Sequence, residues 1–216
     1  MSLSLQKNNR IYKLLHSASE QIKKKFKFDD EGLYSFTNLS IGDEFAAKLL
    51  SLPKINRNSI IIDLFGGLGG SVISLAKQFT TVHTTECDNE RFSMLRYNIS
   101  LFKLTNVVMY NGCYEKYIKN LFCDIVFIDP PWGVNYKQFQ SLRLYITTSS
   151  GRKSLENACI DIIRTCKPKY LALKLPLNYD VKYFIGAVEE DFNLKIVGSL
   201  EYSKPNSMRI ILIAIA

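Results

Sequence analysis

The fold is decided by the stretch Ile60-Ile61-Ile62-Asp63-Leu64-Phe65-Gly66-Gly67-Leu68-Gly69-Gly70, an apolar run of strand length that leads into a glycine-rich turn. Glycines in such a turn let the backbone approach a bound ligand closely, although they also let a strand pack tightly on a helix. A loop that binds nucleotide phosphates would continue with Gly-Lys-Ser or Gly-Lys-Thr, whereas Gly70 is followed by Ser71-Val72. ATP and GTP are therefore disfavoured as ligands.

Outward from this stretch, apolar blocks of strand length alternate with helical patterns, which is typical of a parallel sheet covered on both faces. We expect strands at 60–64, 82–86, 107–110, 125–128, 170–174, 194–200 and 208–214. We expect helices at 41–51, 70–78, 89–101, 114–120, 154–166 and 180–190. The turn-like residues 203–206 make the last two strands an antiparallel hairpin. The predicted fold class is α/β, a Rossmann-like seven-stranded sheet of the class I methyltransferase type, mostly parallel with a C-terminal antiparallel hairpin.

Composition indicates the cell compartment and the classes of partner that the protein can have. Lys and Arg number 28 against 20 Asp and Glu, and this charge of +8 attracts phosphate backbones, although a solvated basic surface gives the same balance. The five cysteines include no Cys-x-x-Cys pair, so we expect reduced thiols and no metal site. The chain has neither an apolar run of about 18 residues nor a signal peptide. We expect a monomer inside the cell, nuclear or cytoplasmic, without a membrane partner.

The N-terminal residues 1–40 are predicted to form a basic, helical extension, and residues 41–216 a single catalytic domain. In Lys23-Lys24-Lys25-Phe26-Lys27-Phe28, charges and aromatic rings interleave as in segments that contact RNA. The alternative is an amphipathic helix whose apolar residues pack on the core while its lysines are solvated. Those apolar residues are Ile11, Leu14, Leu15 and Ile22.

Acidic residues follow the first two core strands. Asp63 suits the cationic amino end of S-adenosylmethionine better than a dinucleotide pyrophosphate. Glu86 is placed to accept both hydroxyls of a ribose, whereas Asp88 more plausibly caps the next helix. After the third strand, Asn111-Gly112-Cys113-Tyr114 should lie beside an adenine, with Tyr114 either packing on that ring or belonging to the core.

The most specific motif is Asp129-Pro130-Pro131-Trp132-Gly133, just past the fourth strand, where open α/β sheets bind ligands. An exocyclic amine is a poor nucleophile, but Asp129 and the Pro130 carbonyl can accept both of its N–H bonds and direct its lone pair. Trp132 offers a face on which a base can stack. The predicted catalytic residues are therefore Asp129, Pro130 and Trp132. The predicted cofactor residues are Asp63, Phe65, Gly67, Gly69, Glu86, Cys113 and Asp129.

This motif, with Asp30-Glu31-Gly32-Leu33-Tyr34-Ser35-Phe36-Thr37 before the first core helix, resembles trimethylguanosine synthase, a family of cap-specific guanine-N2 methyltransferases, over residues 25–216. The resemblance implies methyl transfer from S-adenosylmethionine to N2 of the 7-methylguanosine cap of RNA, giving 2,7-dimethyl- and 2,2,7-trimethylguanosine caps. It implies that residues 1–40 help to bind the cap and that Trp132 stacks on the charged 7-methylguanine, which adds about 0.5–2 kcal/mol. The implied cap-binding residues are Trp132, Tyr34, Asn135, Tyr136, Lys174 and Asn178.

The chain also departs from the family pattern. Leu177 stands where the family usually has an arginine, which leaves Lys174, Lys137, Arg143 or Arg152 to neutralise the cap phosphates. Asp129 stands where the family tends to have a serine. Two other functions stay open: methylation of an exocyclic amine (adenine N6 or guanine N2) in DNA, rRNA or tRNA, and a cap-binding module without catalysis.

Overall fold

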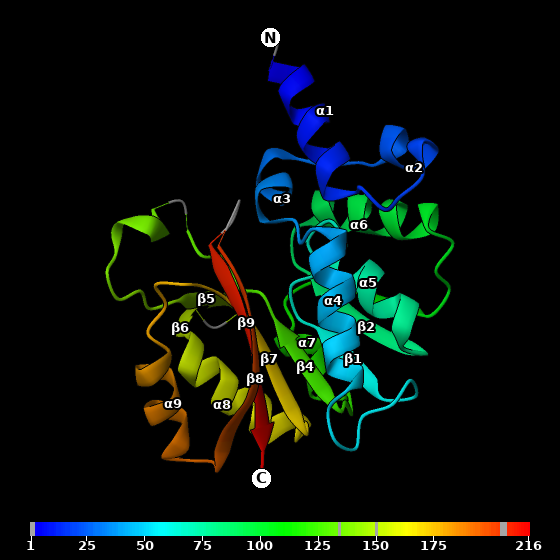
Figure 1. Ribbon diagram of the computed structural model, residues 1–216. Coiled ribbons are helices and arrows are strands. Elements are labelled where there is room, and N and C mark those ends of the chain that lie inside the picture. Colours follow the sequence, from blue (N-terminus) through cyan, green and yellow to red (C-terminus); the bar gives the residue numbers. More distant parts are fainter. Residues whose placement is uncertain (1–2, 134, 150, 204–206) are drawn as a thin grey trace. The chain divides into compact units, whose positions relative to one another are not determined.

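The computed structural model describes residues 3–133, 135–149, 151–203 and 207–216. The chain divides into two compact units, Met1–Gly112 and Cys113–Ala216 (Figure 1). Of the predicted turn at 203–206, residues 204–206 lie outside the described residues.

The first unit carries a parallel part of the sheet. Its strands are β1 (Ile60–Asp63), β2 (Thr81–Glu86) and β3 (Val107–Asn111), in the order β3-β2-β1. Its helices are α1 (Leu3–Leu14), α2 (Glu20–Lys25), α3 (Asp30–Ser35), α4 (Leu39–Leu50), α5 (Gly70–Gln78) and α6 (Asn89–Leu101). A helix connects each strand to the next, so the carboxyl ends of all three strands meet at one edge.

Close packing of α4 on α5 orders the helices beside β1 (Figure 1). This close approach requires glycine at position 42, because a Cβ on Gly42 would lie 2.5 Å from Ser74 Oγ. Phe45 and Val72 are fully buried on these helices. The apolar faces predicted from the helical period therefore form the core on which the glycine-rich turn rests.

The N-terminal arm, residues 3–37, is attached to the first unit by buried side chains. Ile11 and Leu15 are almost completely buried, and Leu14 is buried as well, which confirms their predicted packing. Ile22 is only half-buried, because α2 is too short to present a full apolar face. The lysines of α2 remain at the surface or half-buried, so packing and exposed charge coexist in this arm.

Asn98 of α6 joins the arm to the glycine-rich turn. Its amide group donates hydrogen bonds to the carbonyls of Lys27 at 2.9 Å and Leu68 at 3.1 Å. Its side-chain oxygen accepts a hydrogen bond from the Lys27 N–H at 2.9 Å. Because Asn98 is fully buried, these bonds satisfy its own amide and the buried Leu68 carbonyl.

An ion pair attaches the arm to α6 a second time. Asp29 caps α3 by accepting the Gly32 N–H, and the Arg91 guanidinium donates to the Asp29 carboxylate at 2.7 and 3.2 Å. Burial alone would raise the pKa of Asp29, but the bonds from Arg91 bring the pKa below its ordinary value. The contribution of this pair to stability is therefore complete at neutral pH and is lost only as the pH falls into the acid range.

The second unit contains the rest of the sheet and a small separate hairpin. Its strands are β4 (Ile125–Ile128), β5 (Tyr145–Thr148), β6 (Gly151–Ser154), β7 (Tyr170–Pro176), β8 (Leu194–Tyr202) and β9 (Met208–Ile215). Its helices are α7 (Glu115–Ile118), a 3-10 turn η1 (Tyr136–Gln138), α8 (Leu155–Cys166) and α9 (Val181–Glu189). The sheet order is β4-β7-β9-β8, with β4 parallel to β7 and β9 antiparallel to both of its neighbours.

The structure confirms the predicted fold class. Among the described residues, seven strands belong to the main sheet, three in the first unit and four in the second, and helices precede them. The predicted strands and helices match those found to within a few residues. The antiparallel pair β5–β6 was not predicted, because its mostly polar strands contain no apolar run like those of the equally short β1 and β4. Within the described part of the chain, no helix is long and apolar enough to span a membrane.

Replacing Asn98 with alanine should lower the free energy of unfolding by about 2–4 kcal/mol, because one buried and two partly buried backbone groups lose their partner. Urea unfolding followed by circular dichroism measures this change. Asn58→Ala is the matched control, since Asn58 is exposed, and should change stability by less than about 0.5 kcal/mol. Equal effects of the two substitutions would contradict the role of Asn98.

Candidate functional site

The glycine-rich turn after β1 has one glycine that borders open space and others that pack against the protein. Gly67 has φ +53°, and the nearest atom to a Cβ there would be the Phe65 carbonyl oxygen at 4.0 Å. A Cβ on Gly69 would instead lie 3.1 Å from Leu95, and one on Gly70 would lie 2.4 Å from the Thr37 carbonyl oxygen. The packing role is therefore found at Gly69 and Gly70, whereas Gly67 leaves open space, and approach of a ligand there stays a prediction.

The Asp63 carboxylate holds the glycine-rich turn by hydrogen bonds. Its carboxylate is fully buried at the end of β1 and accepts hydrogen bonds from the Phe65 N–H at 3.0 Å and from the Ser71 hydroxyl at 2.5 Å. Ser71 was not among the predicted site residues, although its place eight residues after Asp63 on the first turn of α5 was available as a signal. Contact of Asp63 with a cofactor remains a prediction.

Glu86 holds the same turn from the neighbouring strand. One of its carboxylate oxygens accepts the Gly67 N–H at 3.0 Å, and the other accepts the Asp88 N–H at 2.9 Å. Asp88 caps α6 by accepting the Arg91 N–H at 2.8 Å, which confirms its predicted capping role. Hydrogen bonds in the first unit thus link Asp63 to Phe65 and Glu86 to Gly67 within the same turn region.

Tyr34 presents an accessible ring in the N-terminal arm. Its side chain is on α3 and the residue is 46% exposed. The Arg10 guanidinium donates to the Tyr34 carbonyl at 3.3 Å and lies 5.7 Å from the ring centroid. Arg10 is a positive charge beside a predicted cap residue, and the sequence analysis did not single it out because nothing local links it to Tyr34.

In the second unit, the register of β4 and β7 explains a buried ion pair. The register pairs Ile128 with Leu173, so the next residues, Asp129 and Lys174, emerge side by side. Lys174 Nζ donates to Asp129 Oδ2 at 2.6 Å, and their side chains are only 5% and 15% exposed. Burial raises the pKa of Asp129 above its ordinary value, and the Lys174 ammonium opposes that rise. Lys174 was predicted to bind the cap; the structure shows its contact with Asp129, and the cap role stays a prediction.

Trp132 lies close to this pair. Lys174 Nζ is 5.8 Å from the Trp132 ring centroid, and the Tyr136 ring meets the indole edge-on at 5.2 Å. The indole N–H is buried and has no hydrogen-bond partner among the described residues. A buried donor without a partner is costly, so a ligand or water that accepts from it would be favoured here.

The loop after this motif is held by Asn178. Its side-chain amide donates to the carbonyls of Tyr136 and Phe139, both at 2.7 Å. Tyr136 is buried and Asn135 is exposed. The structure therefore brings Trp132, Tyr136 and Asn178 together. Asn178 positions the loop, and its contact with a cap stays a prediction.

The predicted adenine loop and the cationic residues are placed as follows. Cys113 is half-buried, while Tyr114 is buried in the core of the second unit, as one of its two predicted roles required.

Arg143 stacks 3.7 Å above the centroid of the exposed Tyr183 ring, and Arg152 lies 4.3 Å from the centroid of the Tyr145 ring. These arginine–tyrosine stacks were not foreseen. Among the described residues, no cluster of His, Cys, Asp or Glu could hold a metal ion.

Comparison with known families gives a match to most of the chain. Residues 58–210 match the model of a family described as RNA cap guanine-N2 methyltransferase. An uncharacterized protein of Acanthamoeba polyphaga mimivirus is 39% identical over 148 residues, which make up 66% of this chain and 56% of that protein. The chain thus spans little more than half the length of this relative.

Solved structures share the fold at low sequence identity. A presumed methyltransferase from Porphyromonas gingivalis W83 has a TM-score of 0.68 at 14% identity, covering 98% of this chain and 48% of its own. A presumed RNA methyltransferase from Pyrococcus horikoshii has a TM-score of 0.63 at 17% identity, covering 88% and 92%. A presumed class I S-adenosylmethionine-dependent methyltransferase from Listeria monocytogenes has a TM-score of 0.62 at 18% identity, covering 100% and 71%.

Fold and family together imply S-adenosylmethionine as the methyl donor, and the residues present fit it. The open face of Gly67 would fill if the glycine carried a larger side chain. The half-buried Phe65 lies in the same turn, and the Glu86 carboxylate at the end of β2 accepts the Gly67 N–H. Phe65, Gly67 and Glu86 are therefore the residues that would hold the donor in the first unit. The donor supplies an electrophilic methyl group carried by a sulfonium.

Gly67→Ala should weaken binding of S-adenosylhomocysteine, measured by calorimetry, about tenfold, because the added methyl enters the open space and a positive φ strains alanine. Gly186→Ala is the matched control, since Gly186 lies within α9 with nothing within 4 Å of an added Cβ. That control should leave affinity unchanged and raise stability by about 0.5–1 kcal/mol. Unchanged affinity in Gly67→Ala would contradict the assignment.

Lys174→Met should lower the free energy of unfolding by about 3–5 kcal/mol, because it leaves the buried Asp129 without its partner. Without Lys174 the pKa of Asp129 rises further, so the folded state binds a proton that the unfolded state releases, and stability falls as pH rises from about 5 to about 8. Urea unfolding at both pH values tests this. The charge-free double variant Asp129→Asn/Lys174→Met should recover most of the loss, and a single variant insensitive to pH would contradict the argument.

Proposed function

The chain belongs to the RNA cap guanine-N2 methyltransferase family, and from this membership we propose that it transfers a methyl group from S-adenosylmethionine to the exocyclic N2 of the 7-methylguanosine cap of RNA. The products are 2,7-dimethylguanosine and, after a second transfer, 2,2,7-trimethylguanosine caps. The observation that carries this proposal is the grouping of Asp129, Lys174 and the indole of Trp132 at the end of β4.

Positioning of the amine is the main contribution that we propose for the motif. The lone pair of an exocyclic amine is delocalised into its ring, so holding the amine in line with the methyl group matters more than a strong base. Asp129 and the Pro130 carbonyl accept the two N–H groups, and Pro131 has no N–H that could compete as a donor. Lys174 holds Asp129 Oδ2, which restrains the carboxylate that meets the amine.

Proton removal follows the transfer. The methylated ammonium is acidic, and Asp129 is a better proton acceptor than an ordinary carboxylate, because burial raises its pKa. The proton passes from the new ammonium to Asp129 and then to water. Proton acceptance is thus the role that we propose for the aspartate at the position where the family tends to have a serine.

Recognition of the charged base is assigned to Trp132. A 7-methylguanine carries a positive charge that strengthens stacking on an indole. The Lys174 ammonium near the same ring would repel that charge, but its contact with Asp129 makes the pair neutral. Discrimination between the cap and unmethylated guanine therefore depends on Asp129 as well as on Trp132.

The first test is transfer from labelled S-adenosylmethionine to 7-methyl-GDP, GDP and an adenine-containing oligonucleotide. Labelling of 7-methyl-GDP alone is the expected result. Labelling of the oligonucleotide alone would overturn the cap proposal in favour of an amine methyltransferase acting on DNA, rRNA or tRNA. Binding of 7-methyl-GDP without any transfer, in a protein that also fails to bind S-adenosylhomocysteine, would identify a cap-binding module.

Trp132→Leu should raise the KM for 7-methyl-GDP about 10- to 100-fold, because both stacking and the cation–π attraction are lost. The turnover number should change far less, since Asp129 and Pro130 remain. Phe139→Leu is the matched control, because Phe139 is an exposed aromatic residue of the same loop, and its KM should stay within about twofold. An unchanged KM in Trp132→Leu would remove Trp132 from cap binding.

A further inference from the structure

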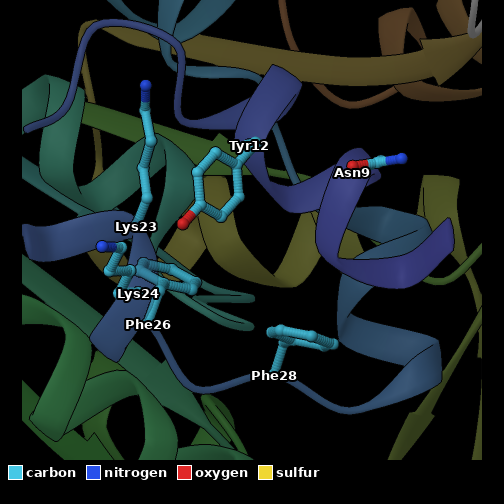
Figure 2. A pocket seen from close by; sticks show the side chains of 6 residues that line it. All are labelled: Asn9, Tyr12, Lys23, Lys24, Phe26 and Phe28. Atoms are coloured by element: carbon cyan, nitrogen blue, oxygen red, sulfur yellow. The ribbon is translucent and has the colours of Figure 1, made fainter. Parts of the chain in front are cut away.

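The N-terminal arm contains a hollow that the cofactor and motif residues do not use. Its volume is about 400 Å³, within the range of about 300–1,000 Å³ typical of ligand pockets. Figure 2 shows the side chains around it, contributed by α1, by α2 and by the segment that follows α2. The lining residues are Asn9, Tyr12, Lys23, Lys24, Phe26 and Phe28.

Aromatic rings provide the apolar part of this hollow. Phe26 is buried and meets Phe36 edge-on, with ring centroids 5.5 Å apart, so it forms a fixed floor. Tyr12 and Phe28 are half-buried and both line the hollow, and Figure 2 shows the Tyr12 hydroxyl pointing toward Lys24 and Phe26. Rings partly open to solvent are surfaces on which a nucleic-acid base can stack.

Lysines provide the charge. Lys24 is exposed, and Lys23 Nζ lies 5.7 Å from the Tyr12 ring centroid. Lys23 also donates to Glu20 at 2.9 Å, but Glu20 is 64% exposed and outside the lining, so water screens most of that attraction. Among the described residues no acidic side chain belongs to the lining, and the two lysines disfavour a cation as the occupant.

We propose that this hollow binds one nucleotide of the RNA chain beyond the cap, with its phosphate near Lys23 and Lys24 and its base against Tyr12 or Phe28. The proposal rests on the proposed function, because it assigns the body of the same capped substrate. Cations and aromatic faces together select single-stranded nucleic acid, whereas an acidic peptide needs only the charge.

The arm is rigid enough for such a role. Lys27, next to Phe26 and Phe28, is held through its backbone by Asn98, and Asn98 also binds the Leu68 carbonyl in the glycine-rich turn. The Lys27 ammonium lies 4.4 Å from the Tyr97 ring centroid. A nucleotide bound in the hollow would therefore be held by a segment that is anchored to the cofactor turn.

The test compares a 7-methylguanosine-capped hexanucleotide with 7-methyl-GDP as methyl acceptors for the full chain and its Lys24→Ala/Phe28→Ala variant. The KM for the capped hexanucleotide should rise about tenfold, and the KM for 7-methyl-GDP should stay within about twofold. The matched control is Lys48→Ala/Phe122→Ala, which removes an exposed lysine and an exposed phenylalanine elsewhere. Equal rises for both acceptors, or no rise for either, would overturn the proposal.

A second measurement separates failure of this proposal from failure of the proposed function. Fluorescence anisotropy of a labelled, uncapped hexauridylate needs no methyl transfer, and its affinity should fall about fivefold in the variant. The slope of log K against log salt should fall by about 0.7 for the lost phosphate contact. Unchanged hexauridylate affinity, or its displacement by polyglutamate at equal charge as readily as by RNA, would overturn the site, whatever the methyl-transfer result.

Discussion

Two buried carboxylates set the shape of the turn on which the first unit depends. Asp63 and Glu86, at the ends of β1 and β2, accept the N–H groups of Phe65 and Gly67. Backbone N–H groups at the carboxyl end of a strand, just before a helix begins, have few partners within the regular structure, and the two carboxylates supply them. The same bonds keep Gly67 at a positive φ with its open face outward.

The N-terminal arm depends on this turn rather than on its own short helices. Helices of six residues are marginal by themselves, so α2 and α3 need contacts with the rest of the unit. Asn98 supplies one such contact, and Asp29 with Arg91 supplies another. A ligand that orders the turn is therefore coupled to the arm that carries Tyr34 and the lysine–aromatic hollow.

In the second unit, the ion pair of Asp129 and Lys174 is as important as the two carboxylates are in the first unit. A buried ion pair adds little stability compared with apolar residues, because two charges must leave water. Its presence beside Trp132 is easier to understand as a chemical need. It gives a restrained carboxylate with a raised pKa, next to an indole whose N–H has no partner in the described part of the chain. In the proposed function, this combination accepts hydrogen bonds from the amine, takes up a proton and stacks a base.

The sequence by itself determined the alternation of strands and helices, the glycine-rich turn, the capping by Asp88 and the family, because each depends on local periodicity or on residues close together in the chain. It also predicted roles in the site for Asp63, Glu86, Asp129 and Trp132. Only the tertiary structure decided that Lys174 pairs with Asp129, that Asn98 holds Lys27 and Leu68, and that Tyr12 and Phe28 face one hollow. These contacts join residues far apart in sequence, and strand register and helix packing bring them together, which no local pattern encodes.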